Sequence, residues 1–153
     1  METVQLMIDR EPTRADPSSG TKTILLVDDE EPVQEIVREM LERRGYRVLV
    51  AGDGHAALRV SSEFSGDIEL LLTDIVMPGM SGLELAKCVS LERPSIKVVY
   101  MSGCLEAVVF AEARMSLRRY FLQKPFMAPM LVEKVREALE DHPASIAVRN
   151  EVL

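Results

Sequence analysis

Apolar runs of strand length alternate with amphipathic segments along most of the chain. The runs hold few polar residues, as is typical of strands buried on both faces of a parallel sheet, and they occupy 24–27, 48–51, 68–73, 96–101 and 120–123. Each run is followed by a segment with apolar residues at helical spacing, at about 32–44, 53–64, 83–91, 105–115 and 129–140. Pro32 and Asp53 suit the starts of the first two helices, and Gly45 suits the end of the first.

Five strand–helix units in strict alternation predict an α/β fold with a doubly wound, five-stranded parallel sheet and helices on both faces. A closed eight-stranded barrel would need further units. In an open sheet of this kind, ligands bind beyond the carboxyl ends of the strands. The residues at these ends therefore carry the functional prediction.

The composition agrees with one soluble domain and disfavours some classes of partner. The chain has 153 residues, 47% of them apolar and 28% charged, with a net charge of −7. Its acidic balance and lack of a basic block disfavour direct binding of nucleic acid, and no apolar run approaches the ~20 residues of a membrane span. No signal peptide is visible. We expect a cytoplasmic protein in which Cys88 and Cys104 are small buried apolar residues.

The two ends of the chain differ from its middle. Residues 11–20 are rich in Pro, Ser and Gly, which is typical of a linker, and a short apolar patch at 4–8 precedes them. We therefore expect a domain at 23–140, between a linker or tail at 1–22 and a C-terminal tail at 141–153.

Polar residues with complementary chemistry follow the apolar runs. Asp28 and Asp29 come after the first run, Asp74 after the third, Ser102 after the fourth and Lys124 after the fifth. Converging carboxylates repel one another unless a cation is present, and hard oxygen ligands suit Mg²⁺, which usually also holds a substrate phosphate. A hydroxyl and an ammonium group are suited to bind that phosphate. The set indicates a metal-assisted phosphoryl-transfer site with an aspartate nucleophile.

Each of these residues also has an ordinary structural explanation. Acids after the first run could favour the start of the next helix, and an aspartate at a strand end is often a turn residue. Ser102 alone would suit a helix cap, and Lys124 alone would be a solvated charge. A nucleotide-binding fold fits less well, because the loop after the first run is acidic and lacks the glycines that cradle phosphate.

Four separated segments resemble the motifs of the receiver domain of two-component response regulators. They are Leu-Val-Asp-Asp-Glu at 26–30, Asp-Ile-Val-Met-Pro-Gly-Met-Ser-Gly at 74–82, Met-Ser-Gly at 101–103 and Lys-Pro-Phe at 124–126. They agree with that family in order and spacing, and the resemblance covers about 23–140. It implies a flavodoxin-like receiver fold with the strand order 2-1-3-4-5.

The resemblance also implies roles for single residues. Asp74 would accept a phosphoryl group from a phosphohistidine of a histidine kinase or histidine phosphotransfer protein. The cofactor Mg²⁺ would be held by Asp28, Asp29, Asp74 and the backbone carbonyl of Val76.

The phosphoryl group and the switch involve three further residues in this resemblance. Ser102 and Lys124 would contact the phosphoryl group, and the peptide between Lys124 and Pro125 would be cis. Ser102 and Phe121 would form a switch that reports phosphorylation.

Three features depart from the usual pattern of this family. Val76 is apolar where many members are polar, which bears on the rate of autodephosphorylation. Phe121 lacks the hydroxyl of the commoner tyrosine, and the segment 114–119 lacks the glycine usually found before the last strand. These departures bear on the rate of autodephosphorylation, on the switch and on the choice of partner.

The function implied is that of a phosphoacceptor receiver domain, which catalyses its own phosphotransfer and autodephosphorylation without turning over an external metabolite. Two contexts fit: a stand-alone regulator, or the C-terminal receiver of a hybrid sensor histidine kinase, which the apolar patch at 4–8 before a linker favours. A pseudo-receiver that binds proteins without being phosphorylated is the alternative, and an aspartate-dependent phosphohydrolase is a third hypothesis. The complete set of acids, Ser102 and Lys124 disfavours the pseudo-receiver.

Overall fold

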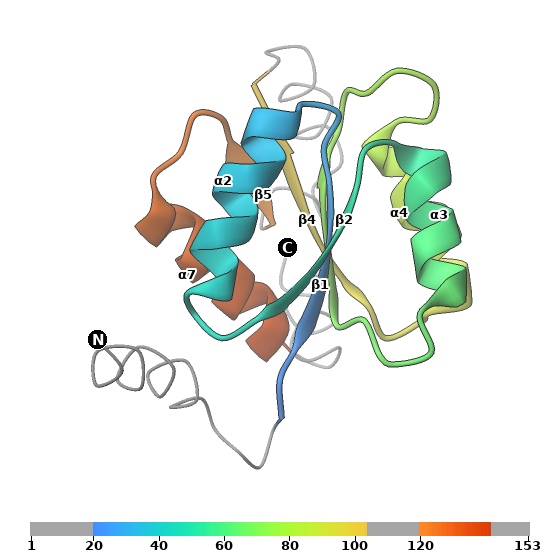
Figure 1. The fold of residues 1–153 in the computed structure, drawn as a ribbon, viewed down its shortest axis with the longest axis horizontal. Coiled ribbons are helices and arrows are strands. Elements are labelled where there is room, and N and C mark those ends of the chain that lie inside the picture. The colour runs from blue at the N-terminus through green and yellow to red at the C-terminus, as the bar shows by residue number, and fades with distance from the viewer. Residues whose placement is uncertain (1–19, 104–119, 142–153) are drawn as a thin grey trace, which may run out of the picture.

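A five-stranded parallel sheet organises the computed structural model, which describes residues 20–103 and 120–141 (Figure 1). The strands are β1 (Thr23–Val27), β2 (Arg47–Ala51), β3 (Leu70–Asp74), β4 (Lys97–Ser102) and β5 (Phe121–Gln123). The helices among the described residues are α2 (Glu31–Glu42), α3 (Gly54–Glu63), α4 (Gly82–Glu92) and α7 (Ala128–Glu140). The order β2-β1-β3-β4-β5 confirms the predicted topology.

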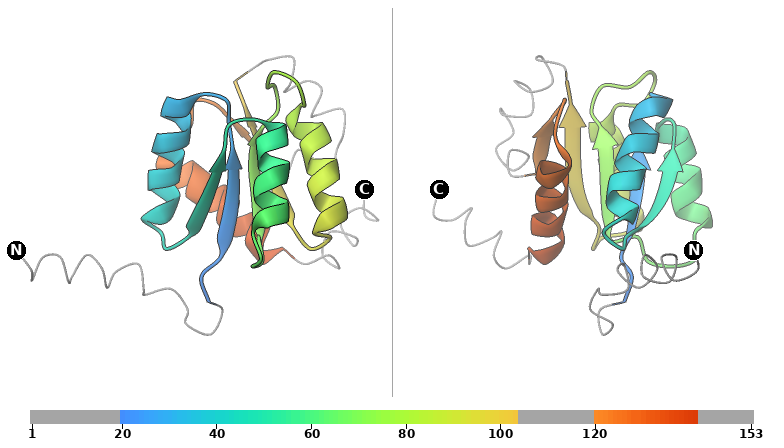
Figure 2. Two further views of the ribbon diagram at one scale, coloured as in Figure 1. Left: turned by 45° about the vertical axis from the view of Figure 1, so that its right-hand side comes forward. Right: turned by 60° about the vertical axis from the view of Figure 1, so that its left-hand side comes forward.

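Helices cover both faces of the sheet (Figures 1 and 2). Helices α2 and α7 lie on one face, and α3 and α4 lie on the other. Ile24 and Leu26 of β1 belong to the core under α2 and α7, whereas Leu25 and Val27 belong to the core under α3 and α4. Because both faces of β1 are buried, its apolar run has no polar alternation.

Local signals place the helix starts where the pattern indicated. Pro32 lies in the first turn of α2, where its missing N–H group leaves no bond unmade. Asp53 caps α3, its Oδ1 accepting a hydrogen bond of 2.8 Å from the Ala56 amide. Gly45 follows α2 with a φ of 94°, a conformation that favours glycine. Gly45 lies beyond the helix, as a glycine stop does, and α2 itself ends at Glu42, earlier than the predicted residue 44.

Some predicted boundaries were displaced. The third strand was expected at 68–73 but runs from Leu70 to Asp74, because Asp74 pairs with Met101 of β4 and extends the ladder. Cys88 on α4 is half-buried rather than buried. The helix expected at 105–115, Cys104, the segment 114–119 and the patch at 4–8 lie outside the described residues.

None of the described helices combines the length and the apolar character needed to cross a membrane.

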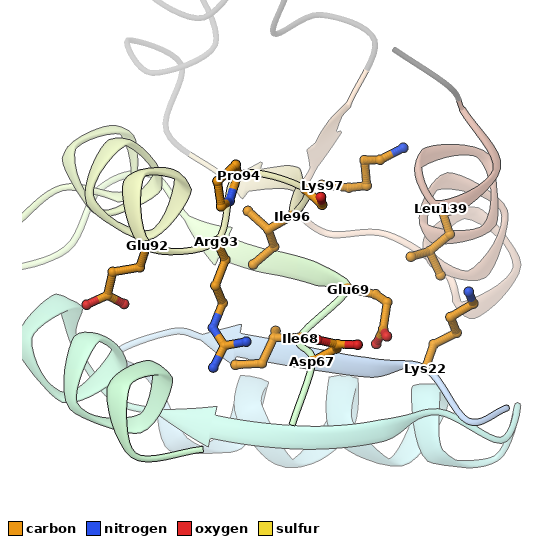
Figure 3. Close-up of a pocket in the computed structure, with 11 residues that line it drawn as sticks. Lys22, Asp67, Ile68, Glu69, Glu92, Arg93, Pro94, Ile96, Lys97 and Leu139 are labelled. Atoms are coloured by element: carbon orange, nitrogen blue, oxygen red, sulfur yellow. The ribbon is translucent and has the colours of Figure 1, made fainter. Parts of the chain in front are cut away.

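A cavity of about 450 Å³ opens at the amino ends of β3 and β4, at the edge of the sheet opposite the predicted site (Figure 3). Two of its charged side chains make hydrogen bonds to backbone groups of neighbouring segments. Glu69 accepts a hydrogen bond of 2.6 Å from the Thr23 amide, and Lys97 donates to the backbone carbonyl of Asp141 after α7. These contacts tie the sheet to its flanking segments.

Arg93 makes the most extensive contacts at this edge. Its guanidinium donates to the carbonyls of Ser61, Phe64 and Gly66 at 2.8–2.9 Å, and to the Ser61 hydroxyl at 3.0 Å. The carbonyls of Ser61 and Phe64 lie at the end of α3, where a helix leaves carbonyl groups without intrahelical partners, and Gly66 follows in the next turn of chain. One side chain after α4 therefore caps α3.

We expect Arg93→Met to lower the free energy of unfolding by about 2 kcal/mol, because several charge-assisted hydrogen bonds are lost together. Chemical denaturation measures this change. Arg38→Met is the matched control, since Arg38 makes an exposed ion pair within α2 and such pairs contribute about 0.5 kcal/mol. Equal effects of the two substitutions would contradict the capping role.

Candidate functional site

The carboxyl ends of β1, β3 and β5 bring together residues that are distant in the sequence. Asp28 directly follows β1, Asp74 ends β3, and Lys124 directly follows β5. Lys124 Nζ lies 2.8 Å from Asp28 Oδ2 and 3.3 Å from Asp74 Oδ2. The Asp28 side chain is 0% exposed, and those of Asp74 and Lys124 are 10% and 18% exposed. One ammonium group thus pairs with two shielded carboxylates.

Asp29 completes a group of three acids at this edge. Carboxylate oxygens of Asp28, Asp29 and Asp74 all lie within 4.8 Å of one another, with Asp29 on the exposed side. Hard oxygen ligands in such a cluster fit Mg²⁺, which takes one or two carboxylates and keeps several waters. The predicted acids therefore meet the chemical requirement for this ion.

The charges of this cluster are not balanced by Lys124 alone. Burial raises the pKa of Asp74 above its ordinary value, and the charge of Asp28 raises it further, against the opposing effect of Lys124. Burial by itself would lower the pKa of Lys124, but its hydrogen bond to Asp28 and the charge of Asp74 outweigh burial and raise it. Lys124 is therefore held in its ammonium form, while the ionised form of Asp74 is disfavoured.

The alternative explanation, that the acids after β1 only cap α2, does not account for the contacts of Asp28. Glu30 is the N-cap residue of α2, and its side chain makes no capping hydrogen bond. Asp28 Oδ1 instead accepts a hydrogen bond of 2.9 Å from the Glu30 amide, while Asp28 Oδ2 binds Lys124. Asp28 therefore supports the turn before α2 and the charge cluster at once.

The other residues predicted for the site differ in burial and in their contacts with this cluster. Ser102 ends β4 with 1% exposure, and its carbonyl accepts a hydrogen bond of 3.0 Å from the Lys124 amide. The Lys124–Pro125 peptide is cis, as predicted. Val76 follows β3 with 54% exposure, and Phe121 is half-buried against the core under α3 and α4.

Two residues near the site received no role from the sequence. Gln34 on α2 donates from Nε2 to the Asp28 carbonyl at 2.6 Å. Gly82 packs against the carbonyl of Asp74, where an added Cβ would lie 2.0 Å from that oxygen. Gly82 belongs to the motif at 74–82, so the sequence could have pointed to it. No local pattern in the sequence distinguishes Gln34.

Comparison with known proteins agrees with this geometry. Residues 24–136 match the family described as response regulator receiver domain. Sensor kinase CckA of Brucella abortus is 35% identical over 127 residues, and response regulator receiver protein CpdR of the same organism is 32% identical over 119 residues. The crystal structure of TrrA from Thermotoga maritima, a complex with Mg²⁺-BeF, has 31% identity and a TM-score of 0.65, and the match covers 77% of this chain and 99% of that one.

The relatives differ greatly in length. The matched region is 83% of this chain but 13% of CckA, whereas for CpdR it is 77% of this chain and 97% of the relative. The same kind of domain thus occurs both within a long sensor kinase and as nearly a whole protein.

The raised pKa of Asp74 predicts how pH affects stability. The folded state binds this proton more tightly than the unfolded state does, so stability falls as pH rises above the ordinary aspartate range near ~4. In a chelating buffer, we expect Asp74→Asn to raise Tm by about 3 °C near neutral pH and to have little effect well below pH ~4, where the Asp74 carboxyl of the wild-type protein is protonated in both the folded and the unfolded state. Thermal unfolding followed by circular dichroism measures both values.

Asp67→Asn is the control, because Asp67 is an exposed aspartate at the opposite edge of the sheet. A lower Tm for Asp74→Asn at neutral pH, or a gain that does not depend on pH, would contradict the charge imbalance.

Proposed function

The chain belongs to the response regulator receiver family of two-component systems, and from this premise we propose that Asp74 is its phosphoacceptor. One observation carries the proposal: the Asp74 carboxylate lies 3.3 Å from Lys124 Nζ and within 4.8 Å of the carboxylates of Asp28 and Asp29. A nucleophile, a cationic partner for the transferred group and oxygen ligands for a cation therefore share one rim of the sheet.

The transfer itself is a displacement at phosphorus. A carboxylate oxygen of Asp74 attacks the phosphorus of a phosphohistidine, the new O–P bond forms as the N–P bond breaks, and the donor imidazole leaves. Lys124 would pair with the incoming phosphoryl oxygens, and the Ser102 hydroxyl would donate to one of them. The short distance between Lys124 and Asp74 supports this assignment.

Asp28, Asp29, Asp74 and the backbone carbonyl of Val76 would hold Mg²⁺ in this proposal. When bound, the ion neutralises the charge that the carboxylates and the phosphoryl oxygens bring together. The clustering of the three carboxylates supports the assignment of the acids.

The phosphodonor would be a histidine kinase or a histidine phosphotransfer protein that docks beside the site. An apolar groove of about 480 Å³ lies between α2 and the segment after β5, and Lys124 belongs to its lining. Ile36 in this groove is 55% exposed. A protein that brings its phosphohistidine to Asp74 must cover this rim, and an apolar surface on the donor would fit the groove.

Phosphorylation would then shift the domain between two conformations that a partner reads. Ser102 and Phe121 are the proposed switch residues, and Phe121 pairs with Tyr100 two residues before Ser102 on β4. Because Phe121 has no hydroxyl, a change in its packing would carry the signal. We further propose a cytoplasmic domain at 23–140, with 1–22 and 141–153 as connecting or terminal segments, in either a hybrid kinase or a stand-alone regulator.

We expect the full chain, incubated with Mg²⁺ and acetyl phosphate, to gain one phosphoryl group on Asp74, because a small donor bypasses the partner. Mass spectrometry locates the label. Asp74→Asn should abolish it, and Lys124→Met should lower the rate at least about tenfold, as for loss of a charge-stabilising group.

Asp53→Asn is a matched control, since Asp53 caps α3 and does not belong to the acidic cluster. A folded protein that takes no label would support the pseudo-receiver instead. Rapid turnover of external phosphate esters would support a phosphohydrolase.

The groove can be tested separately from the chemistry. We expect Ile36→Glu to slow transfer from a phosphorylated histidine phosphotransfer protein about tenfold or more, because a charge would be placed in an apolar contact. Labelling by acetyl phosphate should be unchanged. Glu39→Gln on the same helix is the control, and an equal loss with both donors would contradict a docking role for the groove.

A further inference from the structure

The backbone and side chain of Asp28 are held by contacts from several parts of the fold, and one of these contacts falls on the peptide between Asp28 and Asp29. The Asp28 amide donates to the Ala51 carbonyl at the end of β2, at 3.3 Å. The Asp28 carbonyl accepts a hydrogen bond of 2.6 Å from Gln34 Nε2, and Asp28 Oδ1 accepts one from the Glu30 amide. Gln34 is the side chain that holds the oxygen of this peptide unit.

Gln34 is well placed to transmit the position of α2 to that peptide. Its own amide donates to the Glu30 carbonyl at 3.1 Å, which fixes Gln34 in the first turn of the helix. Its side chain then reaches back to the turn that precedes the helix. Gln34 Nε2 also lies close to Gly52, 3.7 Å from where a Cβ would be, so the side chain lies between α2 and the ends of β1 and β2.

The position of the Asp29 carboxylate depends on this peptide unit more than the position of the Asp28 carboxylate does. Asp28 is buried and its carboxylate has two partners, the Glu30 amide and Lys124. Asp29 is exposed, and no contact within the described residues anchors its carboxylate. Because a peptide unit is planar, the direction of the Asp28 carbonyl also sets the direction of the Asp29 amide and thereby constrains where the Asp29 side chain begins.

We propose that Gln34 is a positioning residue for the cation site. By holding the Asp28 carbonyl, it directs the otherwise unanchored Asp29 carboxylate toward Asp28 and Asp74. The inference rests on the proposed function in one respect, namely that these acids bind Mg²⁺. Groups that orient metal ligands commonly change metal affinity by about 10–100-fold when they are removed.

Gln34→Met tests the proposal, because methionine keeps the length and the helix propensity of glutamine but cannot donate a hydrogen bond. Isothermal titration with MgCl₂ gives the Kd for the ion, and thermal unfolding in a chelating buffer gives the stability of the metal-free fold. We expect Kd to rise about tenfold while the Tm of the metal-free protein changes little.

Gln123→Met is the matched control, since it makes the same chemical change at an exposed residue next to Lys124. Gln34→Leu repeats the loss of the donor in a second side chain, in case one variant folds poorly. A Kd within about threefold of wild type in a folded Gln34 variant, or an equal rise in Gln123→Met, would overturn the positioning role. Absence of Mg²⁺ binding in the wild-type chain would instead overturn the assignment of the metal site itself.

Discussion

Repulsion among Asp28, Asp29 and Asp74 is the constraint to which the rest of the site is fitted. Two of these carboxylates are shielded from water, and Lys124 supplies one positive charge between them. Removing one partner from a buried ion pair is costly, because the other charge is then left uncompensated. Asp28 and Lys124 form the shorter ion pair, whereas the charge of Asp74 is incompletely compensated, as its raised pKa indicates.

The parallel sheet makes this concentration of charge possible. Its central strands are buried on both faces, so β1 and β3 hold the backbone positions of Asp28 and Asp74 firmly. The adjacent helices are fitted closely around them: Gly82 at the start of α4 leaves room for the Asp74 carbonyl, and Gln34 of α2 binds the Asp28 carbonyl. A rigid frame keeps like charges close together, and a cation bound among them would relieve their repulsion.

Much of this arrangement could be predicted from the sequence, because strand ends in an alternating α/β chain meet at one edge. Asp28, Asp74 and Lys124 were identified in this way, and the cap at Asp53 followed from its residue type. Contacts that depend on side-chain direction could not be predicted. Gln34 looks like any polar helix residue in the sequence, and only the fold shows that it turns back to the Asp28 carbonyl.

The pKa of Asp74 is the most direct measure of the charge imbalance among the three acids. Carbon-detected NMR of the side-chain carboxyl group, recorded over a pH series with and without Mg²⁺, follows the ionisation of this one residue. We expect a pKa above that of an ordinary aspartate in a chelating buffer, and a fall in that pKa when Mg²⁺ binds. An ordinary value that Mg²⁺ does not change would contradict this expectation.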